Sequence, residues 1–267
     1  MSHLVDYHIH SRLSPDASDE VDTLCQRAIE ANLAEICLTD HAEFDPKDSA
    51  YENYSYEASQ RQIAHARARF GDQLEIRLGV EVGYQECYKE DIRRFLTDKN
   101  FDMVLGAVHQ VDHLFLNPRE FFAGRREDEV VRLYFQEVLR GVKSGLFDVM
   151  AHLDLVKRHG VPYFGPFMFD KYAVYFEEVL KAMVEHGVGL EINTSGLRHP
   201  PKEPYPGLKA VRLYRELGGE IVTIGSDAHR AEHVGHGLEV GLELARTAGF
   251  KAIALFRGRQ PTFTRIV

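Results

Sequence analysis

Short apolar runs alternate along the chain with longer segments in which apolar residues recur every three or four positions. The apolar runs are rich in valine, isoleucine and leucine and predict buried strands. They cover residues 4–10, 35–40, 75–82, 103–109, 148–153, 189–194 and 220–226. The segments between them predict amphipathic helices. These are residues 19–32, a helix ending near residue 70, 86–98, 127–144, 170–186 and 238–247, followed by a short extended tail.

This alternation predicts an α/β fold with a parallel sheet, because helices must cross over between parallel strands. An open, doubly wound sheet is the alternative, but it normally carries a glycine-rich turn after its first strand. Here the sequence Ser11-Arg12-Leu13-Ser14-Pro15-Asp16 follows that strand instead. We therefore predict that residues 1–267 form a single βα barrel domain.

Composition and charge narrow the class of protein. Apolar residues make up 44% of the chain and charged residues 27%, as in a soluble globular protein. The formal net charge of -9 argues against general binding to nucleic acid or to an anionic membrane. No apolar run approaches the roughly 20 residues of a membrane span, and no secretory leader pattern is present. The cysteines, Cys25, Cys37 and Cys87, form no close pair, so we expect a cytoplasmic protein without disulfides.

The first predicted strand carries the first candidate chemistry. Side chains alternate between the two faces of a strand, so His8 and His10 project to the same side. Two neighbouring imidazoles can bind one metal ion, and Asp6 on the same face can orient a ligand histidine by accepting its other N–H. A histidine pair that merely packs in the core is the alternative. Histidine and acidic residues at the ends of later strands favour metal binding over packing.

Reactive side chains of a parallel barrel gather at the carboxyl ends of its strands. The histidine and acidic residues at this position are His8, His10, His41, Glu81, His109, His152, Asp227 and His229, with Asp16 in the loop after the first strand. Nine ligands are too many for one ion, since zinc usually takes four and octahedral ions take six. The pattern therefore predicts two or three ions, with Glu81 or Asp227 as a bridging ligand.

Six motifs in this order are similar to those of the PHP (polymerase and histidinol phosphatase) family. They are Asp6-x-His8-x-His10, Thr39-Asp40-His41, Gly79-x-Glu81, Ala107-Val108-His109, Ala151-His152-x-Asp154 and Ser226-Asp227-Ala228-His229. The resemblance spans residue 6 to about residue 236. It implies a distorted (βα)7 TIM-like barrel with three metal ions at the carboxyl ends of the strands.

The resemblance also implies a ligand set for each ion. His8, His10, Glu81 and Asp227 hold the first ion, Glu81, His109 and His152 hold the second, and Asp16, His41 and His229 hold the third. Many family members have a histidine where Asp16 stands. Because an oxygen ligand is harder than a nitrogen ligand, this position can favour iron or manganese over zinc. The expected cofactors are three divalent or trivalent ions of zinc, iron or manganese.

The amidohydrolase barrels, which also begin with His-x-His, are the competing family. They usually have eight strands and a bridging lysine on the fourth. In this chain the bridging candidate is Glu81 on the third predicted strand, and no lysine stands at a strand end. The sequence favours the PHP family.

Two loops on the same side of the barrel carry arginines. Arg158 follows the fifth predicted strand, and Ser195 and Arg198 follow the sixth. Both arginines can bind phosphate oxygens in a bidentate manner, and Ser195 is a further candidate phosphate ligand. The segment Glu191–Arg198 resembles the monofunctional histidinol-phosphate phosphatases of the family. That resemblance implies hydrolysis of L-histidinol phosphate, a small phosphomonoester, to L-histidinol and phosphate.

The implied mechanism is attack of a metal-bridging hydroxide on phosphorus, with Glu81 bridging the ions. Asp227 or His229 takes the proton of the water or relays one to the leaving alkoxide, and the sequence leaves this choice open. Candidates for the remaining substrate contacts are Glu43, Asp112 or Glu203 for the ammonium and Tyr84, Phe115, Tyr163, Phe164 or Phe167 for the imidazole. Two other functions stay open: a PHP phosphoesterase for another phosphomonoester, a nucleotide or a nucleic-acid end, and a non-catalytic module that has kept the barrel. The oligomeric state is not predicted.

Overall fold

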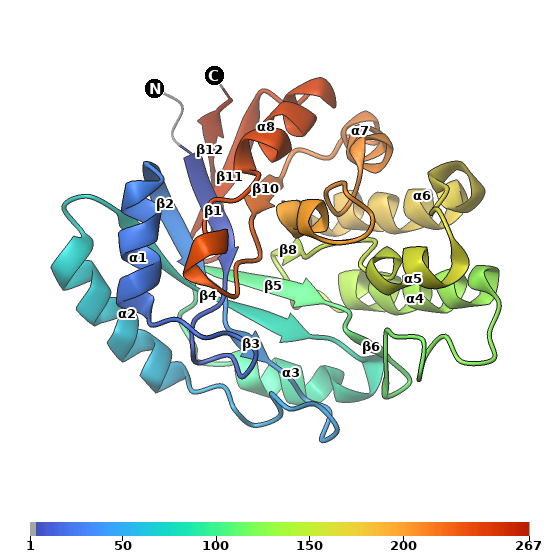
Figure 1. Ribbon diagram of the computed structural model, residues 1–267, viewed down its shortest axis with the longest axis horizontal. Coiled ribbons are helices and arrows are strands. Elements are labelled where there is room, and N and C mark those ends of the chain that lie inside the picture. Colours follow the sequence, from blue (N-terminus) through green and yellow to red (C-terminus); the bar gives the residue numbers. More distant parts are fainter. Residues whose placement is uncertain (1–3, 267) are drawn as a thin grey trace.

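Parallel strands form the centre of the protein, with helices packed outside them (Figure 1). The structure, a computed structural model, describes residues 4–266. Its principal strands are β1 (Leu4–Ile9), β2 (Leu33–Leu38), β4 (Glu75–Gly83), β5 (Met103–Ala107), β8 (Val149–Met150), β9 (Gly189–Asn193) and β10 (Val222–Gly225). They pair in that order, and a two-residue strand, β3 (His41–Ala42), pairs with β4. The seven predicted strands are therefore confirmed.

The first and last strands meet and nearly close the sheet into a barrel. The contact is a parallel bridge between Ile9 and Ala228. The backbone N–H of His10 donates to the carbonyl of Ala228 (2.8 Å), and the N–H of Ala228 donates to the carbonyl of His8 (3.3 Å). This closure brings the β10 end, with Asp227, beside the two histidines of β1. The predicted seven-stranded βα barrel is confirmed.

The predicted helices are also present. They are α1 (Val21–Glu30), α2 (Tyr56–Phe70), α3 (Lys89–Leu96), α4 (Glu127–Lys143), α6 (Phe169–His186) and α8 (Leu238–Thr247). Each buries one apolar face, as α4 and α6 do where the rings of Phe135 and Phe176 lie 4.6 Å apart. Helix α4 has acidic residues in its first turn and Arg140 and Lys143 in its last, which complements the helix dipole.

Several local predictions were wrong. The strand expected at 148–153 has only two residues in the ladder, because His152 adopts a left-handed conformation (φ 57°) that turns the chain. The helix expected at 86–98 begins as a 3-10 turn, η1 (Glu86–Tyr88), before α3. The two segments expected as loops contain α5 (Lys157–Phe164) and η2 (Thr194–Arg198). Segments without a predicted element contain α7 (Leu208–Glu216), η3 (Ala231–His233) and a hairpin of β6 (Gln110–Val111) and β7 (Leu114–Phe115).

The predicted tail is a hairpin, β11 (Ala252–Arg257) and β12 (Gln260–Arg265). It packs at the amino ends of the barrel strands, where the N–H of Phe256 donates to the hydroxyl of Tyr7 (3.0 Å). Arg259 Nε donates to the carboxylate of Asp148, just before β8, at 3.0 Å. The hairpin thus covers the end of the barrel opposite the carboxyl ends of the strands.

The buried residues of the strands include Val80, Met103, Val104, Ile192 and Val222, together with the ion pair of Glu35 and Arg77 (2.7 Å). Within residues 4–266, no helix has the length and apolar character needed to cross a membrane. All three cysteines are unpaired, and two of them are buried.

Candidate metal centre

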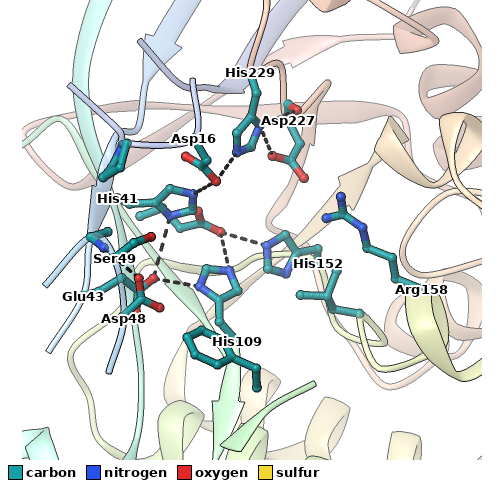
Figure 2. Close-up of a pocket in the computed structure, with 15 residues that line it drawn as sticks. Asp16, His41, Glu43, Asp48, Ser49, His109, His152, Arg158, Asp227 and His229 are labelled. Atoms are coloured by element: carbon teal, nitrogen blue, oxygen red, sulfur yellow. Dashed lines mark hydrogen bonds and ion pairs between the residues drawn. The ribbon is translucent and has the colours of Figure 1, made fainter. Parts of the chain in front are cut away.

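A cavity of about 240 Å³ opens at the carboxyl ends of the strands (Figure 2). Its polar lining includes Asp16, His41, Glu43, Asp48, Glu81, His109, His152, Arg158, Asp227 and His229. His8 and His10 do not reach the cavity wall, because both are fully buried. The structure nevertheless brings all nine candidate ligands into one cluster at this end of the barrel.

The two β1 histidines converge with two carboxylates. Their Nε2 atoms are 3.0 Å apart, as the alternation along the strand predicts. Asp227 Oδ1 lies 3.7 Å from His8 Nε2 and 3.5 Å from His10 Nε2. Glu81, at the end of β4, lies 3.5 Å from each of these nitrogens. These four side chains are the predicted ligands of the first ion.

Glu81 also faces two histidines from neighbouring strands. His152 Nε2 lies 2.8 Å from Glu81 Oε1, and His109 Nε2 lies 3.5 Å from the same oxygen. The left-handed backbone at His152 turns its ring toward Glu81 rather than along the strand. The geometry therefore brings together the predicted ligands of the second ion, with Glu81 positioned to bridge the two groups.

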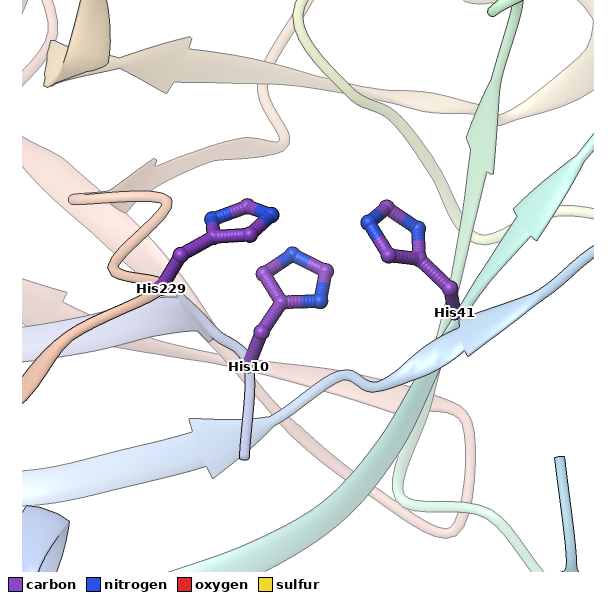
Figure 3. Close-up of side chains that lie close together, drawn as sticks. All are labelled: His10, His41 and His229. Carbon is purple, nitrogen blue, oxygen red and sulfur yellow. The ribbon is translucent and has the colours of Figure 1, made fainter. Parts of the chain in front are cut away.

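Asp16 lies between the remaining two histidines. Its Oδ2 is 3.4 Å from His41 Nε2 and 3.2 Å from His229 Nε2, as Figure 2 shows. The rings of His41 and His229 also converge on His10, each with its centroid 4.2 Å from that of His10 (Figure 3). In addition, His41 Nδ1 lies 2.9 Å from Glu81 Oε2. The three predicted groups are thus in contact with one another through His10, His41 and Glu81.

The donor atoms fit metal ions. Four overlapping sets of three side chains place their donor atoms within 4.8 Å of one another: His8–His10–Asp227, His8–Glu81–His152, His41–Glu81–His109 and His10–His41–His229. Imidazole with carboxylate is a donor set that suits zinc, iron and manganese. Among residues 4–266, the buried Nδ1 atom of His152 has no hydrogen-bond partner. Such an unpaired buried nitrogen is unfavourable unless a cation or water meets it.

The charge states of the cluster also suit cations. Burial alone would raise the pKa of the Glu81 carboxyl, but His8 and His109 hold it well below its usual range. The pKa of Asp227 is likewise lowered, because His8 outweighs the effect of burial. Burial and the nearby His229 hold the pKa of His10 well below the ordinary histidine value. Burial alone would lower the pKa of His8 and His109, but the nearby carboxylates raise it, Glu191 for His8 and Glu43 for His109. A bound metal ion would therefore replace the protons on these imidazoles.

Side chains outside the set of nine candidate ligands orient the imidazole rings within it. Glu191 Oε1 contacts His8 Nδ1 at 2.6 Å, and Glu43 Oε1 contacts His109 Nδ1 at 2.8 Å. Such contacts fix ring orientation and leave the opposite nitrogen for a metal. The sequence reasoning missed the role of Glu191, although an acidic residue inside the apolar run at 189–194 was a signal.

The prediction that Asp6 orients a histidine ring was wrong. Its carboxylate accepts hydrogen bonds from the backbone N–H groups of Ser226 (2.8 Å) and Gly235 (2.9 Å). Asp6 therefore joins β1 to the segment that follows β10, and so supports the backbone beside Asp227.

The three predicted phosphate ligands lie in different places. Arg158 lines the cavity, while Ser195 is buried, with its hydroxyl 2.6 Å from Asn193 Oδ1 and 3.1 Å from Asp227 Oδ2 and its one hydrogen shared between them. Arg198 Nη2 donates to the carbonyls of Ser226 (2.7 Å) and Asp227 (3.0 Å). The other terminal nitrogen of Arg198, Nη1, is buried without a hydrogen-bond partner within residues 4–266.

The candidates for the rest of the substrate are mostly elsewhere. Of the three acids, only Glu43 lines the cavity; Asp112 is in the β6–β7 turn, and Glu203 pairs with Lys157 Nζ at 2.8 Å. Of the five aromatic candidates, only Phe115 lines it. The sequence reasoning missed Asp48, a cavity carboxylate whose Oδ1 accepts from the N–H of Ala50 (2.8 Å).

Comparison with known proteins agrees with this architecture. Residues 6–195 match the PHP domain, and the chain belongs to this family. It is 28% identical to the histidinol-phosphatase of Lactococcus lactis subsp. lactis, over 95% of this chain and 94% of that one. It is 30% identical to a Deinococcus radiodurans protein named "Probable histidinol-phosphatase", over 97% and 99% of the two chains.

A solved structure extends the comparison to the fold. The histidinol phosphate phosphatase of Lactococcus lactis, crystallised with zinc, L-histidinol and phosphate, superposes with a TM-score of 0.90 and 28% sequence identity. The match covers 97% of this chain and 99% of that one. The resemblance to the PHP family is confirmed.

Proposed function

We propose that this protein is a metal-dependent phosphomonoester hydrolase that converts L-histidinol phosphate to L-histidinol and phosphate. The observation that carries the proposal is the convergence of nine candidate metal ligands, seven of which line a cavity that also holds Arg158. The similarity to histidinol-phosphatases over almost the whole chain supports the choice of substrate. We assign the reaction to a single domain in the cytoplasm, which is consistent with the unpaired cysteines.

Each group of the cluster is proposed to hold one ion. His8, His10, Glu81 and Asp227 hold the first ion, Glu81, His109 and His152 the second, and Asp16, His41 and His229 the third. Bound ions supply Lewis-acid stabilisation of the phosphoryl oxygens and lower the pKa of water. Zinc, iron and manganese all suit these donors, with Asp16 making the third group the hardest.

The arginines and Ser195 are proposed to serve the phosphoryl group in two ways. Arg158 at the cavity wall binds equatorial oxygens directly. Arg198 does not line the cavity; it holds the backbone at Asp227 with Nη2 and so positions that segment beside the phosphoryl group. Ser195 fixes the Asp227 carboxylate, so we assign it a positioning role instead of the direct contact predicted from sequence.

Asp227 is proposed to move the proton and His229 to orient Asp227. Asp227 Oδ1 lies 3.4 Å from His229 Nδ1. The Asp227 side chain is only 8% exposed, whereas that of His229 is 27% exposed and can exchange protons with solvent. Asp227 accepts the proton of the attacking water as the water oxygen bonds to phosphorus. The Asp227 carboxyl then returns this proton to the alkoxide oxygen as the phosphorus–ester bond breaks, and His229 orients that carboxyl.

Asp48 and Phe115 are proposed to bind the rest of the substrate. Asp48 is a cavity carboxylate for the ammonium, and Phe115 with Leu155 gives an apolar wall for the imidazole. Glu43 is less suited to the ammonium, because it already contacts His109.

A panel of phosphate esters tests the proposal. Metal-loaded protein is compared on L-histidinol phosphate, p-nitrophenyl phosphate and a nucleoside 3′,5′-bisphosphate. We expect kcat/KM for histidinol phosphate to exceed the others by about 100-fold, because buried polar groups discriminate against substrates that leave them unpaired. A faster reaction with another ester would favour the alternative phosphoesterase, and full metal loading without any hydrolysis would favour a non-catalytic module.

A further inference from the structure

Two segments far apart in the chain line the same cavity, and they touch where Gln110 Nε2 donates to Asp48 Oδ2 at 3.4 Å. The loop between β3 and α2 contributes Asp48, Ser49 and Ala50, and the β6–β7 hairpin contributes Phe115. These are the parts of the wall that carry the proposed contacts to the amino-alcohol half of the substrate. Their relative position therefore bears on which phosphate ester fits.

The buried carboxylate of Asp45 joins the two segments. Asp45 is 3% exposed, and its Oδ2 lies 2.6 Å from His113 Nδ1 at the hairpin turn. The same oxygen accepts from Gln85 Nε2 (3.0 Å), while Oδ1 accepts from the N–H of Lys47 (3.0 Å). Gln85 completes the link, because its Oε1 accepts from the N–H of His113 (2.8 Å) and its Nε2 donates to Gln110 Oε1 (2.8 Å).

The hairpin turn is strained where this contact is made. Asp112 and His113 both have left-handed backbones, with φ of 52° and 63°. Two-residue turns of this kind prefer glycine, asparagine or aspartate, so His113 is the disfavoured residue of the two. His113 has partners that offset this strain. The Asp112 side chain has no hydrogen bond or ion pair with any part of the chain from Leu4 to Ile266.

We propose that Asp45 and His113 are positioning residues that determine specificity for the leaving group. They fix the distance between Asp48 on one segment and Phe115 on the other, and so favour an amino alcohol with an aromatic ring. Neither residue contacts a candidate metal ligand through a hydrogen bond or ion pair in the described part of the chain. The inference rests on the proposed function. It adds to that function two residues that do not touch the reacting atoms.

Matched glycine substitutions separate contact from strain. His113→Gly removes both the ring and the strain, whereas Asp112→Gly relieves strain at the neighbouring position without removing a contact. Asp45→Ala removes the other partner. Each variant is loaded with zinc and assayed on L-histidinol phosphate and on p-nitrophenyl phosphate, which lacks the amino-alcohol group.

We expect His113→Gly and Asp45→Ala to raise KM for histidinol phosphate about tenfold. The kcat for histidinol phosphate, and both kcat and KM for p-nitrophenyl phosphate, should change less than about twofold. The double variant should be no worse than Asp45→Ala, because His113 has already lost its Asp45 partner in that variant. Asp112→Gly should match the wild type. Equal losses on both esters, or equal effects of the two glycine substitutions, would overturn the inference. A wild type that does not prefer histidinol phosphate would overturn the proposed function instead.

Discussion

At the residue scale, Glu191 connects the metal centre to the interior of the barrel. One carboxylate oxygen contacts His8 Nδ1 at 2.6 Å, and the other accepts from Asn193 Nδ2 at 3.0 Å. Both contacts are buried, so each partner depends on Glu191 for its hydrogen bond. The orientation of His8 therefore depends on a side chain that binds no metal itself.

Glu191→Gln should weaken metal binding about 10- to 100-fold, which is the usual effect of losing such a supporting contact. An amide has one acceptor oxygen, so it cannot serve both His8 and Asn193. Competition with a chromophoric chelator measures the affinity, with Glu239→Gln, an exposed glutamate on α8, as the control. Equal affinities of Glu191→Gln and the control would contradict this role.

Arg158→Lys should raise KM for histidinol phosphate about tenfold, because lysine cannot reproduce the planar two-point contact of a guanidinium with phosphate. Steady-state kinetics measure the change, with Arg61→Lys on the outer helix α2 as a matched control. An unchanged KM would remove Arg158 from the phosphate site.

The sequence predicted the nine candidate ligands but few of their supports. His8, Glu81 and Asp227 stand at strand ends, and the geometry of a parallel barrel brings strand ends together. Glu43 and Asp48 were harder to place, because their roles depend on how one loop packs against its neighbours. Arg198 and Ser195 stand in the predicted loop, but their side chains lie against the Asp227 segment.

At the element scale, long periodic segments were predicted best. The strands and the helices α4 and α6 carry a clear apolar pattern, whereas α5 and α7 are short and the β6–β7 hairpin has only two residues in each strand. The length of β8 was wrong because the left-handed turn at His152 has no glycine to indicate it. Such a turn is held by its surroundings and not by local preference.

Asp6 links two elements that the metal centre requires. It lies in β1, and its carboxylate holds backbone groups of Ser226 and Gly235 after β10. Burial raises the pKa of Asp6, although the hydrogen bond with Ser226 opposes this effect. Because the carboxylate supplies an acceptor to these two N–H groups, the contact stabilises the closure of the barrel next to Asp227.

Asp6→Ala should lower the free energy of unfolding by about 2–5 kcal/mol, because it leaves two buried N–H groups without acceptors. Urea denaturation at constant metal concentration measures the loss. Asp72→Ala, in an exposed turn, is the control and should have little effect. A loss for Asp6→Ala no larger than that of the control would show that the link contributes nothing to stability.

At the scale of the whole molecule, the barrel gathers histidines and carboxylates at one end and covers the other end with the β11–β12 hairpin. The hairpin was predicted only as an extended segment, because its contacts with Tyr7 and Asp148 join distant parts of the chain. The barrel itself was predictable, since the order of strands and helices allows few parallel arrangements.

Removing the metal should destabilise the whole molecule. An ion that binds only the folded chain adds about 3–4 kcal/mol at 100 to 1,000 times its Kd, which is about 5–15 °C in Tm for a chain of this size. Thermal unfolding before and after chelation measures the shift, and added zinc should restore it. A Tm that stays constant while elemental analysis shows complete metal loss would contradict a structural contribution of the ions.

The central claim is that the cluster around Glu81 performs metal-dependent hydrolysis of histidinol phosphate. The most direct test is the initial rate of phosphate release from L-histidinol phosphate by zinc-loaded wild type and Glu81→Gln, with metal content measured on the same samples. We predict release by the wild type and a loss of at least about 100-fold in the folded variant, together with reduced metal content. No release by the metal-loaded wild type, or equal rates for the two proteins, would contradict the claim.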